Sequence, residues 1–163
     1  GTLTDHYDPR SKVVRLSSNI YKGTSLAGTA VAAHEVGHAI QDQQDYVPLR
    51  FRHTLVPVAK IGSNLAFIFI LGGFLLHIMG AAILGIIFFS AAVLFQLVTL
   101  PVEFNASNRA MDQVVTLGII RNDEERKTKK VLNAAALTYV AAALVAVLEL
   151  LRFILMFMGM NRD

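Results

Sequence analysis

The sequence contains no cysteine, and it is also short of charge, since only 17% of its 163 residues are charged. The lack of cysteine excludes a disulfide framework, thiolate zinc sites and a cysteine nucleophile, so any metal must be bound by His, Asp or Glu. The charged fraction of 17% is below the roughly 25% that is usual in soluble domains. The apolar fraction is 54%. The net charge of +3 is too small to indicate nucleic acid as a partner. The composition therefore predicts a membrane protein with a polar part.

Charge is also absent from a long apolar block that runs from residue 61 to residue 102. A helix needs about 20 apolar residues to cross a bilayer, so this block is long enough for two crossings. A tight turn at 77-HIMG-80 would divide it into helices of about 61–78 and 81–101. A third apolar segment, about 132–158, predicts another membrane helix, in which Glu149 and Arg152 are spaced to form a local ion pair.

The stretch 31-VAAHEVGHAIQ-41 places two histidines four positions apart. His34 and His38 at this spacing project from one face of a helix, so both ring nitrogens can bind one zinc ion at about 2 Å. Glu35 lies beside them, where it can act as general base on a zinc-bound water and later protonate the leaving amine. Gly37 costs about 1 kcal/mol in a helix relative to Ala, which indicates close packing. HExxH is a short pattern with chance matches, and its apolar, alanine-rich surroundings strengthen it.

A catalytic zinc ion needs a third protein ligand and one open position. A third histidine of the metzincin type would fall at position 44, which is Gln44. Glu103, at the end of the second predicted membrane helix, is the better candidate, with Asp112 as the fallback, and Asn105 or Ser107 could hydrogen-bond a ligand. The other histidines, His6, His53 and His77, fit ordinary polar or interfacial positions. Of these, His6 could also contact substrate.

Two residues are candidates for stabilising the oxyanion that forms at a scissile carbonyl. They are Tyr139, near the start of the third membrane helix, and Arg109. Tyr139 has an ordinary alternative, because tyrosine is common at membrane interfaces. The predicted strand 12-KVVRLS-17 could likewise bind an extended substrate by main-chain pairing, or be purely structural.

The distribution of basic residues predicts the topology. Residues 1–60 hold seven Lys and Arg, residues 103–133 hold six, and the 77–80 turn holds none. By the positive-inside rule the polar segments face the cytoplasm. Two crossings return the chain to its starting side, so the histidine helix and Glu103 should lie on the same side of the membrane.

Four segments in order, TDHYDPR (4–10), AHEVGHAIQ (33–41), LPVEFNAS (100–107) and ALTYVAA (136–142), resemble the YugP-type neutral zinc metallopeptidases of bacterial membranes. The resemblance covers essentially the whole chain. It implies that the family's HExxH falls on His34, Glu35 and His38, and its EFxAS glutamate on Glu103. That family typically has a membrane helix and a soluble stretch before TDHYDP, so we expect upstream segments in the natural protein. The more distantly similar HtpX-type peptidases carry Asp where this chain has Ser107, which predicts a substitute for that carboxylate.

The sequence therefore predicts a mainly α-helical, polytopic membrane protein with about three transmembrane helices, an HExxH zinc helix and a short N-terminal strand segment. We expect one domain over residues 1–163, whose regions are a strand and zinc-helix part (1–60), a transmembrane hairpin (61–101), a polar segment (102–131) and a third transmembrane helix (132–158).

The predicted function is a gluzincin-like, Zn²⁺-dependent endopeptidase that acts on peptides or proteins, membrane proteins included. It would lie in the bacterial inner membrane as a multi-pass protein, in contact with lipid, with its site facing the cytoplasm. The alternative is a catalytically idle zinc-binding scaffold or chaperone-like adaptor; a di-iron site is excluded because it needs a second ExxH.

Overall fold

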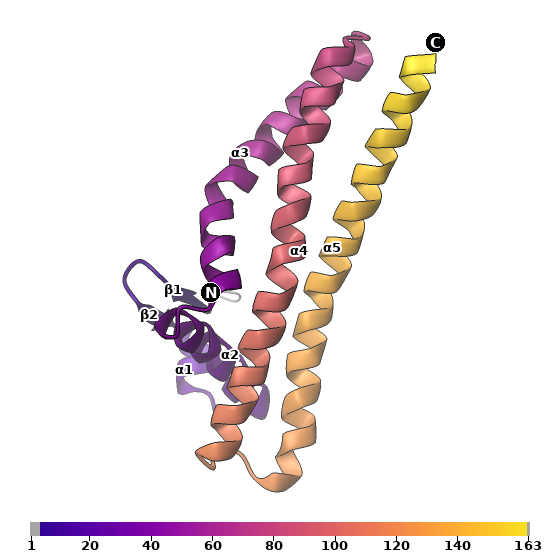
Figure 1. Ribbon diagram of the computed structural model, residues 1–163. Helices are drawn as coiled ribbons and strands as arrows, with labels where there is room; N and C mark the ends of the chain where they lie inside the picture. Colours follow the sequence, from indigo (N-terminus) through magenta and orange to yellow (C-terminus); the bar gives the residue numbers. More distant parts are fainter. Residues whose placement is uncertain (1–3, 163) are drawn as a thin grey trace. The chain divides into compact units, whose positions relative to one another are not determined.

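The structure is a computed structural model that describes residues 4–162 (Figure 1). It is mainly helical, and the chain falls into two compact units, Gly1–Arg50 with Pro101–Thr138 and Phe51–Leu100 with Tyr139–Asp163. The elements in chain order are β1 (His6–Asp8), β2 (Val13–Arg15), α1 (Ser18–Lys22), α2 (Leu26–Gln43), α3 (Val47–Leu75), α4 (Met79–Thr116), the short 3-10 helix η1 (Asn122–Glu124) and α5 (Glu125–Arg162). The predicted fold class, mainly α with three apolar helices long enough to cross a membrane and a short N-terminal strand part, is confirmed.

The first unit begins with a β-hairpin that lies beside α2. β1 and β2 pair antiparallel, with Tyr7 opposite Val14. Asp8 closes the turn between them by accepting hydrogen bonds from the Arg10 backbone N–H at 2.9 Å and the Ser11 hydroxyl at 2.6 Å. Only β2 was expected; β1 was missed because a strand of three residues that contains His and Asp carries little β propensity.

Helix α2 carries the two histidines, and its start and its packing follow from two small residues. Ser25 is the N-cap, and its side chain accepts a hydrogen bond from the Gly28 backbone N–H at 3.0 Å. Gly37 is buried against α4, where an added Cβ would collide with the carbonyl oxygen of Ala106. The predicted close packing at Gly37 is therefore confirmed, and it brings α2 against the stretch of α4 that carries Glu103.

The core of the first unit is a small apolar cluster that joins α2 to the polar ends of α4 and α5. Ala30, Ala110 and Leu132 are buried against one another, with Met111 and Val131 packed at the edge. Each of the three helices contributes one of the buried residues. This cluster fixes α4 beside α2 within the unit.

The second unit holds the apolar parts of the three long helices. An added Cβ on Gly73 of α3 would lie 2.5 Å from the backbone nitrogen of Ala82 in α4, and one on Gly62 would lie 2.8 Å from the carbonyl oxygen of Phe88. Small residues of this kind allow helices to approach closely where no water drives their association. His77 has a φ of 52° in the turn that joins the two helices, at the predicted break. The turn therefore lets α3 and α4 pack as a hairpin.

The long helices extend beyond the predicted membrane segments. α3 begins at Val47 instead of near residue 61, and Pro48 lies in its first turn, where a missing backbone N–H costs nothing. α4 continues through Pro101 to Thr116, and α5 begins at Glu125. Hydropathy marks the part of a helix that can lie in lipid, not the ends of its hydrogen-bonded backbone. The region predicted as a polar segment, 102–131, is consequently helical over most of its length.

Candidate metal centre

Helix α2 places the two histidines of the HExxH motif together. The ring centroids of His34 and His38 are 4.8 Å apart, and the rings are nearly perpendicular. His38 is buried and His34 is half-buried. The i, i+4 spacing alone produces this arrangement, because such residues lie one above the other on a helix.

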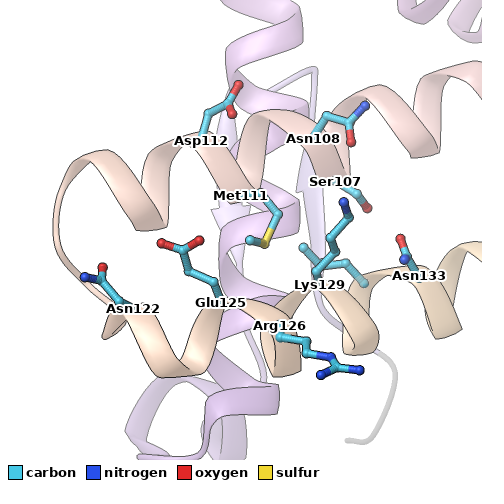
Figure 2. A pocket seen from close by; sticks show the side chains of 10 residues that line it. Ser107, Asn108, Met111, Asp112, Asn122, Glu125, Arg126, Lys129 and Asn133 are labelled. Carbon is cyan, nitrogen blue, oxygen red and sulfur yellow. The ribbon is translucent and has the colours of Figure 1, made fainter.

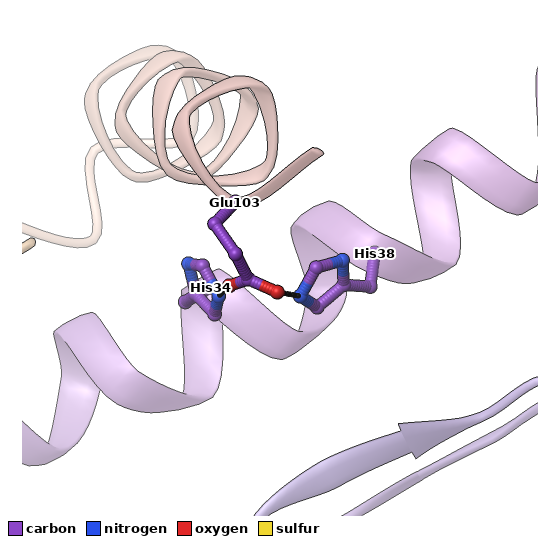
Figure 3. Close-up of side chains that lie close together, drawn as sticks. All are labelled: His34, His38 and Glu103. Carbon is purple, nitrogen blue, oxygen red and sulfur yellow. Dashed lines mark hydrogen bonds and ion pairs between the residues drawn. The ribbon is translucent and has the colours of Figure 1, made fainter. Parts of the chain in front are cut away.

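Glu103 reaches the same point from α4 (Figure 3). Its Oε2 lies 2.8 Å from Nε2 of His34, and its Oε1 lies 3.4 Å from Nε2 of His38. Glu103 is only 2% exposed, and a buried carboxylate must be paired because its desolvation is costly. Residues that are far apart in the sequence thus converge on one spot.

The donor atoms of this cluster fit a zinc ion. Two imidazole nitrogens and one carboxylate oxygen form a ligand set found in catalytic zinc sites, and one such atom from each of His34, His38 and Glu103 lies within 4.8 Å of the others. Ligands at about 2.1 Å around a tetrahedral ion are roughly 3.4 Å apart, which is near the N···O separations observed. The fallback ligand Asp112 is exposed and lies outside this group, as does His6.

Gln41 fixes the orientation of the His38 ring. The Gln41 amide nitrogen donates to the carbonyl oxygen of Val102 at 2.8 Å and to Oδ1 of Asn105 at 3.0 Å, so the amide oxygen must face the other way. This oxygen lies 2.9 Å from Nδ1 of His38. Because an amide oxygen can only accept, Nδ1 carries a proton, and Nε2 is the ring nitrogen that faces Glu103. Such outer hydrogen bonds orient a histidine for a metal.

Ser107 makes the corresponding contact to the other histidine. Its hydroxyl lies 3.0 Å from Nδ1 of His34, which leaves Nε2 of that ring directed at Glu103. The prediction that Asn105 or Ser107 could support a ligand agrees with these contacts, with Ser107 acting on His34 directly and Asn105 on His38 through Gln41.

The charge of Glu103 also acts on the protonation of His38. Burial by itself lowers the pKa of His38, but the hydrogen bond and negative charge of Glu103, helped by Gln41 and Glu35, more than offset this and raise the pKa above its ordinary value. Metal binding requires a neutral imidazole. A proton on Nε2 of His38 therefore competes with a metal ion for that nitrogen.

Glu35 lies at the edge of the cluster and beneath the β-hairpin. Burial raises the pKa of its carboxyl group above the ordinary value, and the charge of Glu103 adds to this, while His38, His34 and a hydrogen bond from the Tyr7 backbone N–H act in the opposite direction. Glu35 is not among the three convergent ligand atoms. It is thus placed beside the cluster as a partly buried carboxylate with an elevated pKa.

Tyr7 attaches the hairpin to α2 at a second point. Its hydroxyl donates to Oδ2 of Asp42 at 2.5 Å, and Arg50 holds the other carboxylate oxygen of Asp42 at 2.7 Å. Burial and the bond to Asp42 raise the pKa of Tyr7 to about 12, so the phenol remains a donor at neutral pH. The hairpin therefore lies over the part of α2 that carries Glu35.

Arg109 and Tyr139, the two oxyanion candidates, have different settings. The Arg109 guanidinium donates to Oδ1 of Asn105 at 2.7 Å and to the side chain of Gln44, and it stacks over the Tyr46 ring at 5.4 Å. Arg109 thus extends the chain of contacts that begins at Gln41. Tyr139 belongs to the second unit, and its role stays a prediction.

Sequence reasoning missed three residues that shape this site: Gln41, Tyr7 and Asp42. Gln41 is fully buried, yet it reads as the polar end of a helix in the sequence. One signal was available, because Gln41 is three positions after His38 and so lies on the same helical face. Nothing in the sequence pairs Tyr7 with Asp42, since the contact depends on how the hairpin folds back.

Comparison with known proteins places these residues in a family context. Residues 1–158 match the family described as "Putative neutral zinc metallopeptidase". The chain is 58% identical over 163 residues to the "Putative membrane protease YugP" of Bacillus subtilis (strain 168), and the match covers 100% of this chain and 72% of that protein. No solved structure is significantly similar to the chain.

Proposed function

The chain belongs to this neutral zinc metallopeptidase family, as its sequence segments predict, and we propose that it is a zinc-dependent membrane endopeptidase. One observation carries the proposal. The Nε2 atoms of His34 and His38 and the carboxylate of Glu103 converge, while the carboxylate of Glu35 lies beside this set without belonging to it. A peptidase of this kind needs both parts, a metal-binding group and a separate base.

In this proposal His34, His38 and Glu103 bind zinc, and Gln41 and Ser107 hold the rings in place. A zinc ion, when bound there, supplies Lewis acidity toward water and the peptide carbonyl. The protein provides the fixed geometry, because each histidine has its second nitrogen engaged at 2.9–3.0 Å. The burial of Glu103 limits competition from bulk water for these donors.

Glu35 acts as the general base. It takes a proton from the attacking water and passes it to the leaving amine. A base is most effective when its pKa lies near the working pH, and burial moves the pKa of Glu35 upward, toward that range. In the metal-free protein the positive charges of protonated His38 and His34 oppose this rise, and a bound zinc cation would supply positive charge in their place, which favours the ionised form of Glu35 that can accept a proton.

The oxyanion that forms at the carbonyl requires a donor. Arg109 and Tyr139 are retained as the proposed candidates. Arg109 already contacts Asn105 and Gln44, so it would act after a change of hydrogen-bond partner or through these side chains.

The protein is proposed to lie in the bacterial inner membrane as a multi-pass protein, with the metal centre on the cytoplasmic side. Support comes from three helices that are long and apolar enough to cross a membrane and from the thirteen basic residues that lie in 1–60 and 103–133. The absence of native cysteine makes a direct test simple. A cysteine at exposed Asp123 should react with a membrane-impermeant maleimide only after the cells are opened, whereas one at His77 should react in intact cells. The reverse labelling pattern would contradict the orientation.

The catalytic proposal is tested by comparing metal content and cleavage in three variants. Glu103→Ala should lose zinc, since the removal of even an outer partner costs about 10–100-fold in metal affinity. Glu35→Gln should keep zinc but lose cleavage of casein by about 100-fold or more. Asp123→Asn, an exposed control away from the cluster, should behave as wild type in both measurements.

The outcome also separates the peptidase from a zinc-binding scaffold or adaptor. If wild type and Glu35→Gln bind zinc equally and neither cleaves, the chain is an idle scaffold. If Glu103→Ala binds zinc as tightly as wild type, the third ligand has been assigned wrongly.

A further inference from the structure

A groove of about 600 Å³ lies between α4 and α5 in the first unit, next to the metal centre (Figure 2). Ser107 lines one part of it and is at the same time 3.0 Å from the ring of His34. Asp112 of α4 and Glu125 and Lys129 of α5 line it farther along. One side chain therefore belongs both to the groove and to the contacts of the metal centre.

The charges of the groove are separated along its length. Figure 2 shows the Lys129 ammonium reaching toward Ser107, and the Glu125 carboxylate at the opposite end, beside Asn122. A glutamate four residues before a lysine on a helix ordinarily forms an ion pair with it. In the part of the chain that the structure describes, Glu125 and Lys129 do not approach within 4 Å, and each faces the groove instead. Arg126 also lines the groove, and Figure 2 shows its guanidinium directed away from the Glu125 carboxylate. The groove is thus positive near the metal centre and negative at the end that holds the Glu125 carboxylate.

We propose that this groove binds the substrate peptide beside the metal centre and selects a chain with a carboxylate nearer the cut bond and a cationic side chain farther from it. The selection follows from charge complementarity, with Lys129 facing the carboxylate and Glu125, aided by Asp112, facing the cation. This inference rests on the proposed peptidase function, because the metal centre defines where the cut occurs.

The spacing of the two charges in the substrate follows from helix geometry. Glu125 and Lys129 are separated by about 6 Å along α5, at about 1.5 Å per residue. An extended peptide advances about 3.3–3.6 Å per residue, so this separation corresponds to about two positions. Because the Lys129 and Glu125 side chains extend in opposite directions (Figure 2), the two substrate charges should be about two to four positions apart. The single hydrogen bond between His34 and Ser107 places the start of the groove within about two extended residues of the metal ligands.

The test uses the full chain, loaded with zinc in detergent, and a library of random peptides. Each peptide contains one Asp and one Lys about two to four positions apart, in either order, and mass spectrometry locates the cuts. Wild type should cut with Asp nearer the bond than Lys, preferred about threefold to tenfold for two partly exposed charge pairs. The double variant Glu125→Lys/Lys129→Glu should reverse this preference without changing the net charge.

A matched control uses the same spacing outside the groove. Asp123→Lys/Lys127→Glu exchanges the same charges at i, i+4, and neither residue lines the groove, so it should retain the wild-type preference. The proposal is overturned if the groove variant keeps the wild-type preference, or if the control changes it as much as the groove variant does.

A binding measurement keeps the groove testable if no cleavage is observed. A fluorescent decapeptide whose only charge is one carboxylate is titrated against wild type, Lys129→Glu and Lys130→Glu. It is prepared both with an Asp side chain and an amidated end, and with a free C-terminus alone, which distinguishes the two sources of carboxylate. Lys129→Glu should bind at least one of them about threefold to fivefold more weakly, whereas Lys130→Glu should match wild type. Equal binding by both variants contradicts the groove proposal. Weaker binding by Lys129→Glu alone, with no cleavage by wild type, supports the groove and counts against the peptidase.

Discussion

The two units of this chain are stabilised in different ways. The first unit buries polar side chains and gives them partners: Gln41 is 0% and Glu103 2% exposed, and both are held by hydrogen bonds or ion pairs. The second unit packs glycines against the backbone of a neighbouring helix, while large apolar side chains such as Phe67 remain 70% exposed. Exposed apolar surface of this kind suits a hydrocarbon environment.

This difference indicates where each unit is sensitive. A buried polar group that loses its partner pays the full desolvation cost, so the first unit should respond most to the loss of a hydrogen bond. Helix association in lipid depends on close packing, so the second unit should respond most to added volume.

The largest effect is expected from the hydrogen-bond network of the metal centre. Gln41→Leu removes the acceptor for Nδ1 of His38 and should lower zinc affinity about 10–100-fold. Competition with a chelator of known zinc affinity measures it. Gln43→Leu is the control, because Gln43 is exposed on the same helix. If both variants bind zinc as wild type does, Gln41 does not orient the ligand.

The corresponding effect in the second unit comes from added volume. Gly73→Ala should lower the free energy of unfolding by about 1–3 kcal/mol through overpacking, because the new Cβ would meet the Ala82 backbone at 2.5 Å. Gly72→Ala has nothing within 4 Å of its new Cβ and should be neutral or stabilising, since Ala favours helix by about 1 kcal/mol. Loss of helical signal during denaturation in SDS compares the two, and similar unfolding would contradict close packing at Gly73.

A smaller, graded effect is expected from pH at the metal centre. Zinc must displace the proton of His38, whose pKa is raised mainly by Glu103 against the effect of burial. Zinc affinity should therefore fall as pH decreases through that elevated pKa. The metal-free protein should show the opposite trend, because a group with a raised pKa stabilises the fold below its unfolded value and loses this contribution as pH rises through the folded value. Zinc titrations and unfolding at several pH values test both signs, and zinc affinity that is independent of pH would contradict the assignment.

Much of this site could be predicted from sequence because local spacing determines it. The positions of His34 and His38 on one helical face follow from the α-helix repeat, and the role of Gly37 from the cost of glycine in a helix. The three apolar helices follow from hydropathy. The ends of these helices could not be predicted from hydropathy. α3 and α5 continue well past the apolar segments, because backbone hydrogen bonding decides where a helix ends.

By itself the sequence determined the i, i+4 histidine pair, the apolar hairpin and the candidate carboxylates, because helix periodicity and hydropathy are local properties. Only the tertiary structure decided which carboxylate meets the histidines and how the rings are held. Glu103 rather than Asp112 converges on His34 and His38, and the carbonyl oxygen of Val102 sets the amide of Gln41, which in turn sets the tautomer of His38. Contacts of this kind depend on the close approach of α2 and α4 at Gly37 and Ala106, and a distance between two helices is not encoded in the spacing of residues along either one.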